Sequence, residues 1–355
     1  MPITLESLNR QFPQSNGIVR CNNRNVWIQQ ALMKSEGYSA FQGYCSGGGA
    51  GGLCVLHVYR SASRDIWAHN SEWFRQTYPP NDSVYSFLDA SSVPGFCYIV
   101  LRQPSATLRS VLSNSDLRPL PRRQACEIVY QVVKGIEALL SGAALLGDIT
   151  PEDIEMEDLT LVNEEFWDPM ARRMSTRQVL KSTQLRVLYK GTCRLEGWCD
   201  PATLAYRAPE VAFGVDWAAT SVMFAMGCVA FEVMTQRPLL LAPTDTAFPL
   251  AQMVYQYHHI LGALPNALKP HFRNISGVRS VDEQNEAPVF EEGVITAASE
   301  AFVRRSSIRM DILDDLAYDL IVDLAQLNFS SRPNVLQAQS SLFFEGLFSY
   351  STMRG

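Results

Sequence analysis

The chain lacks an excess of basic residues, a signal peptide and a long apolar run. Its 355 residues include 30 Lys and Arg against 36 Asp and Glu, a formal net charge of -6, so the overall charge does not favour a nucleic-acid partner. The first residues, MPITLE, lack the basic-then-apolar order of a signal peptide. No apolar stretch reaches the roughly 18 residues that a membrane-spanning helix needs. We therefore expect neither a nucleic-acid nor a membrane partner, and a location in the cytoplasm or nucleus.

Eight cysteines are present, but no two of them form a C-x-x-C pair. That absence argues against a zinc site and against a redox-active pair. In a chain of this length without a secretory signal, free thiols in the core are the ordinary state of cysteine. The neighbouring His258 and His259 have no cysteine or carboxylate after them at the spacing of metal ligands. We therefore expect free thiols rather than a metal centre.

The first third of the chain has the pattern of a β-rich region. Short apolar runs rich in β-branched and aromatic residues are typical of strands. The glycine-rich segment 47–52 suits either a turn between two strands or a loop that binds phosphate, and we favour the turn because glycines need no phosphate to explain them. The predicted strands cover 53–59, 83–88 and 96–101, and residues 61–76 suit a helix.

The pattern becomes helical after about Gln103. From Ile128 to Leu139, apolar residues recur three and four positions apart, as one face of an amphipathic helix requires. Residues 274–308 are polar and mixed, and they indicate an insert or loop. The predicted helices cover 122–140, 221–234 and 311–327.

Three stretches carry motifs in the order and spacing of one family. YRAPE occupies 206–210 and is followed by MGC at 226–228; residues 179–188 suit the strand pair before a metal-binding triplet, and 260–265 read ILGALP. These stretches resemble eukaryotic protein kinases, and in particular the LAMMER-type dual-specificity (cdc2-like) kinases. The resemblance implies a bilobal α+β fold, with a small β-rich N-lobe and a larger, mostly α-helical C-lobe.

The resemblance also implies a division of the chain. We predict an N-terminal extension over 1–27, an N-lobe over 28–103 and a C-lobe over 104–349 with its insert at about 274–308. Residues 350–355 would form a tail.

Several residues stand at positions that this family uses. Asp148 occupies the position of the catalytic-loop aspartate, and Asp153 replaces the metal-binding asparagine, where its oxygens could still hold a cation. Glu210 and Arg332 stand at the positions of a buried structural ion pair. These retained residues favour a folded kinase-like C-lobe.

Other positions have lost the residue that phosphate or metal chemistry needs. Gly37 is retained in the phosphate loop, but its flanking glycines are Ser35 and Ala40. His57 stands where the family has a lysine that contacts phosphates, so a neutral imidazole replaces a fixed cation. His57 could instead bond to Glu72, the position of the helix carboxylate, or simply pack in its strand.

The metal position itself is changed most. Tyr189 replaces the aspartate that holds magnesium, and a neutral phenol does not substitute for a carboxylate at pH 7. Leu101 and Arg102 occupy the connection that borders the adenine site in this family, where a bulky cation would hinder nucleotide entry. Val222 stands where the family has a buried aspartate that organises the catalytic loop.

These differences favour a pseudokinase, a kinase-like module that binds or regulates a protein partner without phosphoryl transfer. No cofactor is then expected. The alternative is an atypical active serine/threonine or dual-specificity protein kinase that transfers the ATP γ-phosphate to protein hydroxyls. Asp148 would be its base, Asp153 with Glu152 would hold magnesium, and Lys34 would replace the missing lysine.

Overall fold

The computed structural model describes most of the chain, in ranges that are separated by gaps. These ranges are 18–21, 24–34, 38–46, 51–60, 83–85, 87–93, 96–104, 106–141, 148–168, 170–188, 201–215, 218–243, 246–272, 274–281 and 287–349. The chain folds as two compact units. The first comprises Met1–Ser105, Ala138–Gly147 and Val187–Trp198, and the second comprises Ala106–Glu137, Asp148–Arg186 and Cys199–Gly355.

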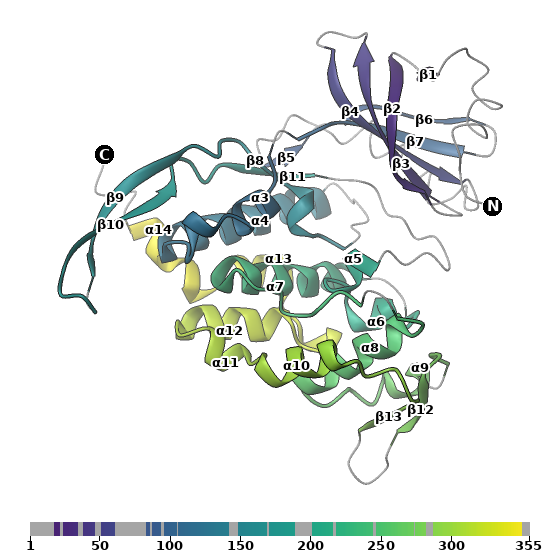
Figure 1. The fold of residues 1–355 in the computed structure, drawn as a ribbon, viewed down its shortest axis with the longest axis vertical. Coiled ribbons are helices and arrows are strands. Elements are labelled where there is room, and N and C mark those ends of the chain that lie inside the picture. The colour runs from purple at the N-terminus through teal and green to yellow at the C-terminus, as the bar shows by residue number, and fades with distance from the viewer. Residues whose placement is uncertain are drawn as a thin grey trace. The chain divides into compact units, whose positions relative to one another are not determined.

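A six-stranded antiparallel sheet forms the body of the first unit and curls in Figure 1. The order of its strands is β1-β2-β3-β4-β7-β6. The glycine-rich segment lies between β3 and β4, which pair as antiparallel neighbours, so the structure agrees with a hairpin connection there. The strands are β1 (Ile18–Arg20), β2 (Asn25–Lys34), β3 (Tyr38–Ser46), β4 (Gly52–Arg60), β6 (Phe87–Val93) and β7 (Phe96–Arg102).

One face of this sheet holds an apolar core. Alternate residues of each strand share a face, and the residues that meet include Phe41 of β3, Leu56 and Val58 of β4, and Val100 of β7, all at most 1% exposed. Beside the sheet, the short strand β5 (Val84–Tyr85) pairs in parallel with the end of β11 (Leu185–Leu188). The strands predicted over 53–59 and 96–101 are confirmed by β4 and β7. The strand predicted over 83–88 is divided between β5 and β6, which belong to different sheets. The helix predicted over 61–76 lies outside the described residues.

The second unit is mainly helical, and most of its helices stack in layers in Figure 1. Its α-helices are α3 (Leu108–Leu112), α4 (Arg122–Ser141), α5 (Pro201–Leu204), α6 (Pro209–Ala212), α7 (Ala219–Thr235), α8 (Pro249–Gln256), α9 (Lys269–Phe272), α10 (Ala297–Arg305), α11 (Ile308–Asp311), α12 (Asp315–Leu324), α13 (Val335–Gln339) and α14 (Glu345–Ser349). Short 3₁₀ turns are η1 (Ser115–Leu117), η2 (Pro151–Asp153), η4 (Phe329–Ser331) and η5 (Leu342–Phe344), and η3 (Tyr257–Leu261) is a π-helical turn.

Helix α7 runs through the centre of this unit. Its residues from Ser221 to Val233 are all buried, as expected for a helix that is apolar on every side. Gly227 sits where α7 approaches α12 most closely, because a Cβ there would lie 3.0 Å from both the Leu324 Cβ and the Ala325 nitrogen. The prediction of a helix over 221–234 is confirmed, and α4 likewise confirms the helix predicted over 122–140.

The helix predicted over 311–327 is shorter than its periodicity suggests. Asp314 accepts hydrogen bonds from the backbone N–H groups of Leu316 and Ala317, at 3.1 and 3.2 Å. This side chain is an N-cap, so α12 begins at Asp315. Residues 312–314 belong to no helix, and α12 ends at Leu324, so the predicted helix is too long at both ends.

Two small hairpins complete the second unit. Strands β9 (Leu161–Asp168) and β10 (Arg173–Leu180) pair with each other, as do β12 (Val278–Val281) and β13 (Pro288–Phe290); β8 (Ile154–Met156) is a further short strand. Residues 274–308, predicted to be an insert or loop, contain the β12–β13 hairpin and α10 in their described parts. Local capping explains α10: Thr296 accepts from the backbone N–H of Ser299 and begins the helix within a polar sequence.

Candidate functional site

The segment that carries Asp148 and Asp153 is a tightly capped turn. The backbone N–H and the hydroxyl of Thr150 both donate to Asp153 Oδ2, at 3.0 and 2.8 Å. In return, the backbone N–H of Asp153 donates to the Thr150 carbonyl at 2.9 Å. Pro151 suits the first position of η2 because its fixed φ matches a helical turn and its missing N–H is not needed there. These contacts fix the backbone of residues 150–153.

The carboxylate of Asp148 is held by an arginine of the same unit. Arg207 Nε donates to Asp148 Oδ2 at 2.7 Å, and the two side chains are only 15% and 8% exposed. The pKa of Asp148 lies above its ordinary value, mainly because burial disfavours the charged form. The Arg207 guanidinium acts in the opposite direction and lowers the pKa, while the nearby Asp153 charge raises it. Asp148 therefore sits in a nearly closed environment where its oxygen already accepts a charge-assisted hydrogen bond.

Arg207 is itself oriented by the core of the unit. It lies between α5 and α6, and its Nη2 donates to Thr203 Oγ1 at 3.2 Å. Its backbone carbonyl accepts from the hydroxyl of Tyr257 at 2.6 Å. Tyr257 is fully buried on η3, where its ring meets Phe213 and Phe224 edge-on at 5.9 and 6.0 Å. The Arg207–Asp148 pair thus rests on packed aromatic side chains.

Asp153 serves the turn rather than a described metal cluster. Its side chain is buried, and its Oδ2 is occupied by the two Thr150 donors. In the ranges that the structure describes, no three or more His, Cys, Asp or Glu side chains are grouped so that they could hold a metal ion. Glu152, the second carboxylate considered for magnesium, bonds instead to Arg109 at 2.7 Å.

In the first unit, His57 is a buried residue of β4. It is 6% exposed on β4, with Ala40 of β3 and Ile99 of β7 as its cross-strand partners. Leu56 and Val58 point into the apolar core, so the imidazole points to the opposite face of the sheet. The residues beside His57 in the two neighbouring strands are therefore both apolar.

Leu101 and Arg102 end β7 in this unit. Leu101 is 2% exposed, and Arg102 is exposed. The next residue, Gln103, donates its backbone N–H to the Leu53 carbonyl at 3.0 Å, which extends the pairing beyond the strand. The other three predicted positions, Gly37, Glu72 and Tyr189, lie outside the described residues.

The structure brings Glu210 and Arg332 together in a buried ion pair. Arg332 Nη1 and Nη2 donate to the two Glu210 oxygens at 2.5 and 2.8 Å, and the side chains are 0% and 1% exposed. Ser221 adds a hydroxyl donor to Glu210 at 2.8 Å. The guanidinium also lies 5.0 Å from the Phe224 ring centre. All hydrogen-bonding groups of this pair are thus used inside the unit.

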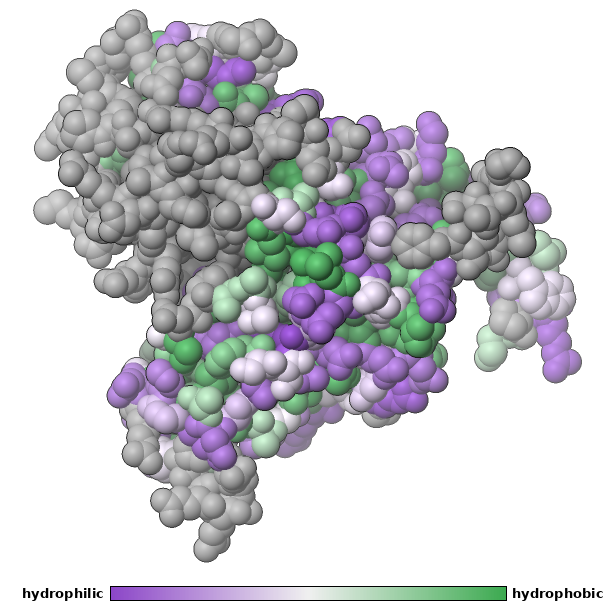
Figure 2. Space-filling view, turned by 180° about the vertical axis from the view of Figure 1, so that it is seen from behind, coloured by the Kyte–Doolittle hydropathy of each residue, from purple (hydrophilic) through white to green (hydrophobic). Residues whose placement is uncertain are grey.

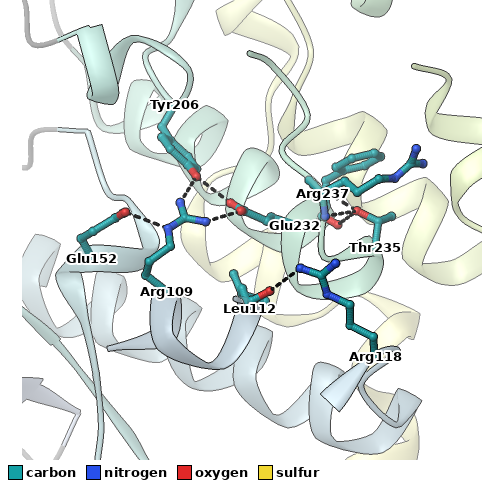
Figure 3. Close-up of polar contacts among 9 residues, drawn as sticks. Arg109, Leu112, Arg118, Glu152, Tyr206, Glu232, Thr235 and Arg237 are labelled. Atoms are coloured by element: carbon teal, nitrogen blue, oxygen red, sulfur yellow. Dashed lines mark hydrogen bonds and ion pairs between the residues drawn. The ribbon is translucent and has the colours of Figure 1, made fainter. Parts of the chain in front are cut away.

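A second charged network was not anticipated from the sequence. Figure 3 shows Arg109 of α3 between three partners: Glu152 on η2, Tyr206, and Glu232 on α7. Arg109 donates to the Tyr206 hydroxyl at 2.6 Å, and that hydroxyl donates to Glu232 at 2.6 Å. Because Glu232 is only 4% exposed, Arg109 and Tyr206 are what compensate its buried charge.

The pKa shifts of Tyr206 and Glu152 agree with this network. Burial and the Glu232 carboxylate raise the pKa of Tyr206, so its hydroxyl keeps its proton and remains a donor. Burial raises the pKa of Glu152, but the Arg109 guanidinium lowers it more and keeps that carboxyl ionised. The sequence signal for Arg207 and Tyr206 was present in the YRAPE motif. No local pattern marks Arg109 or Glu232, because their partners lie 43 and 123 positions from Arg109.

Parts of the sequence are similar to known protein kinases. No family model matches the chain. Among curated proteins it is similar to a dual specificity protein kinase of Schizosaccharomyces pombe, with 24% identity over 138 residues, 38% of this chain and 19% of that protein. It is also similar to the cell division control protein 2 homolog C of Antirrhinum majus, with 26% identity over 48% of this chain and 50% of that protein.

A third relative is a serine/threonine-protein kinase of Arabidopsis thaliana, with 25% identity over 40% of this chain and 34% of that protein. The matched stretches thus span half or less of each of these relatives. The crystal structure of a kinase domain is similar over 94% of this chain and 98% of its own, with a TM-score of 0.66 and 14% identity. The fold is that of a protein kinase domain.

This kinase-like domain is a mixed α+β fold, with a curled sheet in its N-terminal region and helices in its C-terminal region. The expected fold class is confirmed. Its distant relatives are dual-specificity and cdc2-like kinases. Of the helices in the described ranges, none combines the length and apolar character that crossing a bilayer requires.

Proposed function

We propose that this kinase-like domain is a pseudokinase, a module that binds or regulates a protein partner without transferring phosphate. The observation that carries the proposal is the state of Asp148. A catalytic-loop aspartate must accept the proton of a substrate hydroxyl. Here its Oδ2 accepts from Arg207 at 2.7 Å in a nearly closed environment. A substrate hydroxyl would have to compete with a guanidinium for that carboxylate.

The residues available to a magnesium–ATP complex fit it poorly. His57 lies at the position of the phosphate-binding lysine, but its partners across the sheet are Ala40 and Ile99. Asp153 has one oxygen committed to Thr150, and Tyr189 stands where the metal-binding aspartate is needed. Phosphoryl transfer depends mostly on positioning and electrostatic stabilisation, so losing several of these groups together removes most of the catalysis. We therefore propose no cofactor for this domain.

The parts that serve packing are intact, which supports a binding role. The Glu210–Arg332 pair is buried and hydrogen-bonded through both carboxylate oxygens, and α7 is buried from Ser221 to Val233. A domain that keeps its scaffold can present surfaces to a protein partner whether or not it holds nucleotide. No feature above favours nucleic acid or a membrane as that partner.

Two measurements test the proposal. The first is thermal unfolding with ATP, with and without magnesium. A ligand at 100 times its dissociation constant would add about 2.7 kcal/mol to the free energy of unfolding. We expect no magnesium-dependent stabilisation.

The second measurement is transfer of radiolabelled γ-phosphate to a generic basic protein, with Asp148→Asn as the control. We expect no incorporation above that of the control. Magnesium-dependent stabilisation together with incorporation that disappears in Asp148→Asn would establish the alternative, an atypical active protein kinase that uses Asp148 as its base.

A further inference from the structure

The β9–β10 hairpin exposes an unusual group of side chains at its free end. In Figure 1 it projects from the helices of its unit, and the same projection lies at the right of Figure 2, where pale green and purple residues lie beside each other. Trp167, Met170 and Met174 are 59%, 94% and 58% exposed. Register pairs Met174 with Trp167, so these two side chains share one face of the ribbon. With Arg172 and Arg173 they form what we call the hairpin tip.

The hairpin tip is held in place at its base and in its turn. Val179 and Leu180 are buried, and the Gln124 side chain of α4 bonds to both the N–H and the carbonyl of Leu180, at 3.1 and 2.6 Å. In the turn, Asp168 Oδ1 accepts from the backbone N–H groups of Met170 and Ala171, at 2.9 and 3.0 Å. The exposed side chains therefore project from a defined backbone.

The two edges of the ribbon carry opposite charges. Strand β9 contributes the acidic side chains Glu164, Glu165 and Asp168, and β10 with the turn contributes Arg172, Arg173 and Arg177. Arg177 is occupied, since its Nε and Nη2 donate to Glu164 Oε2 at 2.8 and 2.6 Å. Arg173 lies opposite Asp168 in the register, but Asp168 Oδ1 accepts from the turn backbone, and within the described residues neither Arg172 nor Arg173 forms an ion pair. With two arginines and one aspartate, this end of the ribbon carries a net positive charge.

No described strand pairs with that edge, although Gln124 bonds to it at Leu180 and η1 lies beside β10. Within the described residues, β9 and β10 form a sheet of two strands, so the outer side of each strand lacks a neighbouring strand. An open edge can take an extended peptide, whose side chains then alternate between the two faces of the ribbon. Beside β10, alternate peptide side chains would lie next to Met174 on one face and next to Arg173 on the other.

We propose that the β10 edge of the hairpin tip binds an extended segment of a partner protein in which acidic and apolar residues alternate. The apolar residues would contact Met174 and Trp167, and the carboxylates would pair with Arg173 and Arg172. Charge selects β10 over β9, because an acidic strand beside Glu165 and Asp168 would be repelled. Exposed Trp, Met and Arg side chains together are also the composition that protein interfaces favour.

This inference goes beyond the proposed function and is independent of phosphate transfer, because the hairpin binds in the same way whether or not the domain is active. A negative phosphotransfer result leaves it untouched, and its own failure leaves the pseudokinase proposal standing. The two are therefore tested separately.

The test is selection of a phage-displayed library of random 12-residue peptides on the immobilised full chain. We expect enriched sequences that alternate Asp or Glu with large apolar residues. Synthetic versions of these peptides should bind Arg173→Glu/Met174→Ser at least about tenfold more weakly. The matched control is Arg279→Glu/Leu313→Ser, which changes an exposed arginine and a 91% exposed leucine elsewhere and should bind as the unaltered chain does.

All of these side chains are exposed, so both double variants should give the same circular dichroism spectrum and the same thermal unfolding curve as the unaltered chain. If Arg173→Glu/Met174→Ser does not fold, the single variant Arg173→Glu takes its place. Absence of enriched peptides, or peptides that bind the hairpin variant equally, would overturn the proposal. So would hairpin-dependent self-association in sedimentation equilibrium, which would identify a second copy as the occupant. Hairpin-dependent flotation with phosphatidylserine vesicles would identify a lipid surface instead and would also overturn it.

Discussion

At the level of single residues, two opposed effects act on the pKa of Asp148. Burial raises its pKa because the charged form loses water, and Arg207 lowers it by attraction. The net direction is upward, so the folded chain holds this proton to a higher pH than the unfolded chain does. The ion pair reduces the shift without cancelling it.

This direction predicts a pH dependence. Below the ordinary pKa of an aspartate, about 3.9, both states are protonated and the contribution of Asp148 to stability is complete. As the pH rises through that value toward the raised folded pKa, the unfolded state loses its proton first, so the free energy of unfolding falls. We expect the stability of the unaltered chain, measured relative to Asp148→Asn by urea unfolding, to fall across this window.

The sign of that difference is the critical result. A stability difference that rises over the same pH range would mean that Arg207 dominates and that the pKa of Asp148 is lowered. Arg207→Met serves as the control: it removes the attraction, so the decline should extend to higher pH than in the unaltered chain.

The Glu210–Arg332 pair predicts a different response to substitution. Both side chains are at most 1% exposed, so removing one leaves an unpaired charge in the core. We expect Arg332→Met to lower the free energy of unfolding by about 3–5 kcal/mol. The double variant Glu210→Leu/Arg332→Met should lose less than the sum of the single changes, because no buried charge remains unpaired.

Urea unfolding of the four chains in this double-mutant cycle provides the measurement. If the losses simply add, then the two side chains do not depend on each other in the folded state. That outcome would contradict the ion pair at 2.5 and 2.8 Å.

At the level of elements, Arg109 links helix α3 to η2 and α7. Its removal leaves the buried Glu232 with Tyr206 alone. We expect Arg109→Ala to lower the free energy of unfolding by about 1–3 kcal/mol, less than for a fully buried pair because Arg109 is 34% exposed and water screens its charge. The matched control is Arg123→Ala, whose partner Glu127 lies one helical turn away on the surface of α4.

Loss of that exposed pair should cost at most about 0.5 kcal/mol. If Arg109→Ala and Arg123→Ala lower the stability equally in thermal unfolding, then the Arg109 network contributes no more to the free energy of unfolding than the surface pair does. A larger effect confined to Arg109→Ala would support its role in joining the three elements.

Elements with a strong period could be predicted from sequence, and elements set by single caps or turns could not. Apolar residues three and four positions apart gave α4 within one residue of its end. The β9–β10 hairpin escaped prediction because most of its side chains are exposed, so its strands lack the apolar alternation that marks a half-buried strand. The helix predicted over 311–327 was too long at its start because one aspartate, Asp314, fixes where α12 begins.

At the level of the whole molecule, the order of motifs predicted the fold class, since a kinase domain needs its segments in a fixed sequence. The identities of Asp148, Glu210 and Arg332 also followed from those motifs. Their partners could not be predicted in the same way, because Arg207 lies 59 positions from Asp148 and only the folded chain brings the two together. Pairing across such distances depends on tertiary packing, which a linear pattern does not record.

The division into two compact units leads to a last prediction. Burial and the neighbouring Cys45 raise the pKa of the Cys54 thiol in the first unit to about 12, and burial raises that of Cys126 in the second to about 11. At pH 8 both are almost entirely protonated and shielded, so neither should react with iodoacetamide until its unit unfolds and its pKa returns to about 8.5. Peptide-resolved mass spectrometry along a urea series then reports each unit separately.

We expect Cys54 to react at a lower urea concentration than Cys126. The first unit is built on one curled sheet with a small core, whereas the second surrounds α7, which is buried from Ser221 to Val233. A smaller unit buries a smaller fraction of its surface. Cys228, at the centre of α7 and 1% exposed, belongs to the same unit as Cys126. It should become reactive at the same urea concentration as Cys126 and serves as the internal control. If all three thiols become reactive at the same urea concentration, the chain unfolds as one cooperative body and the two units have no separate stability.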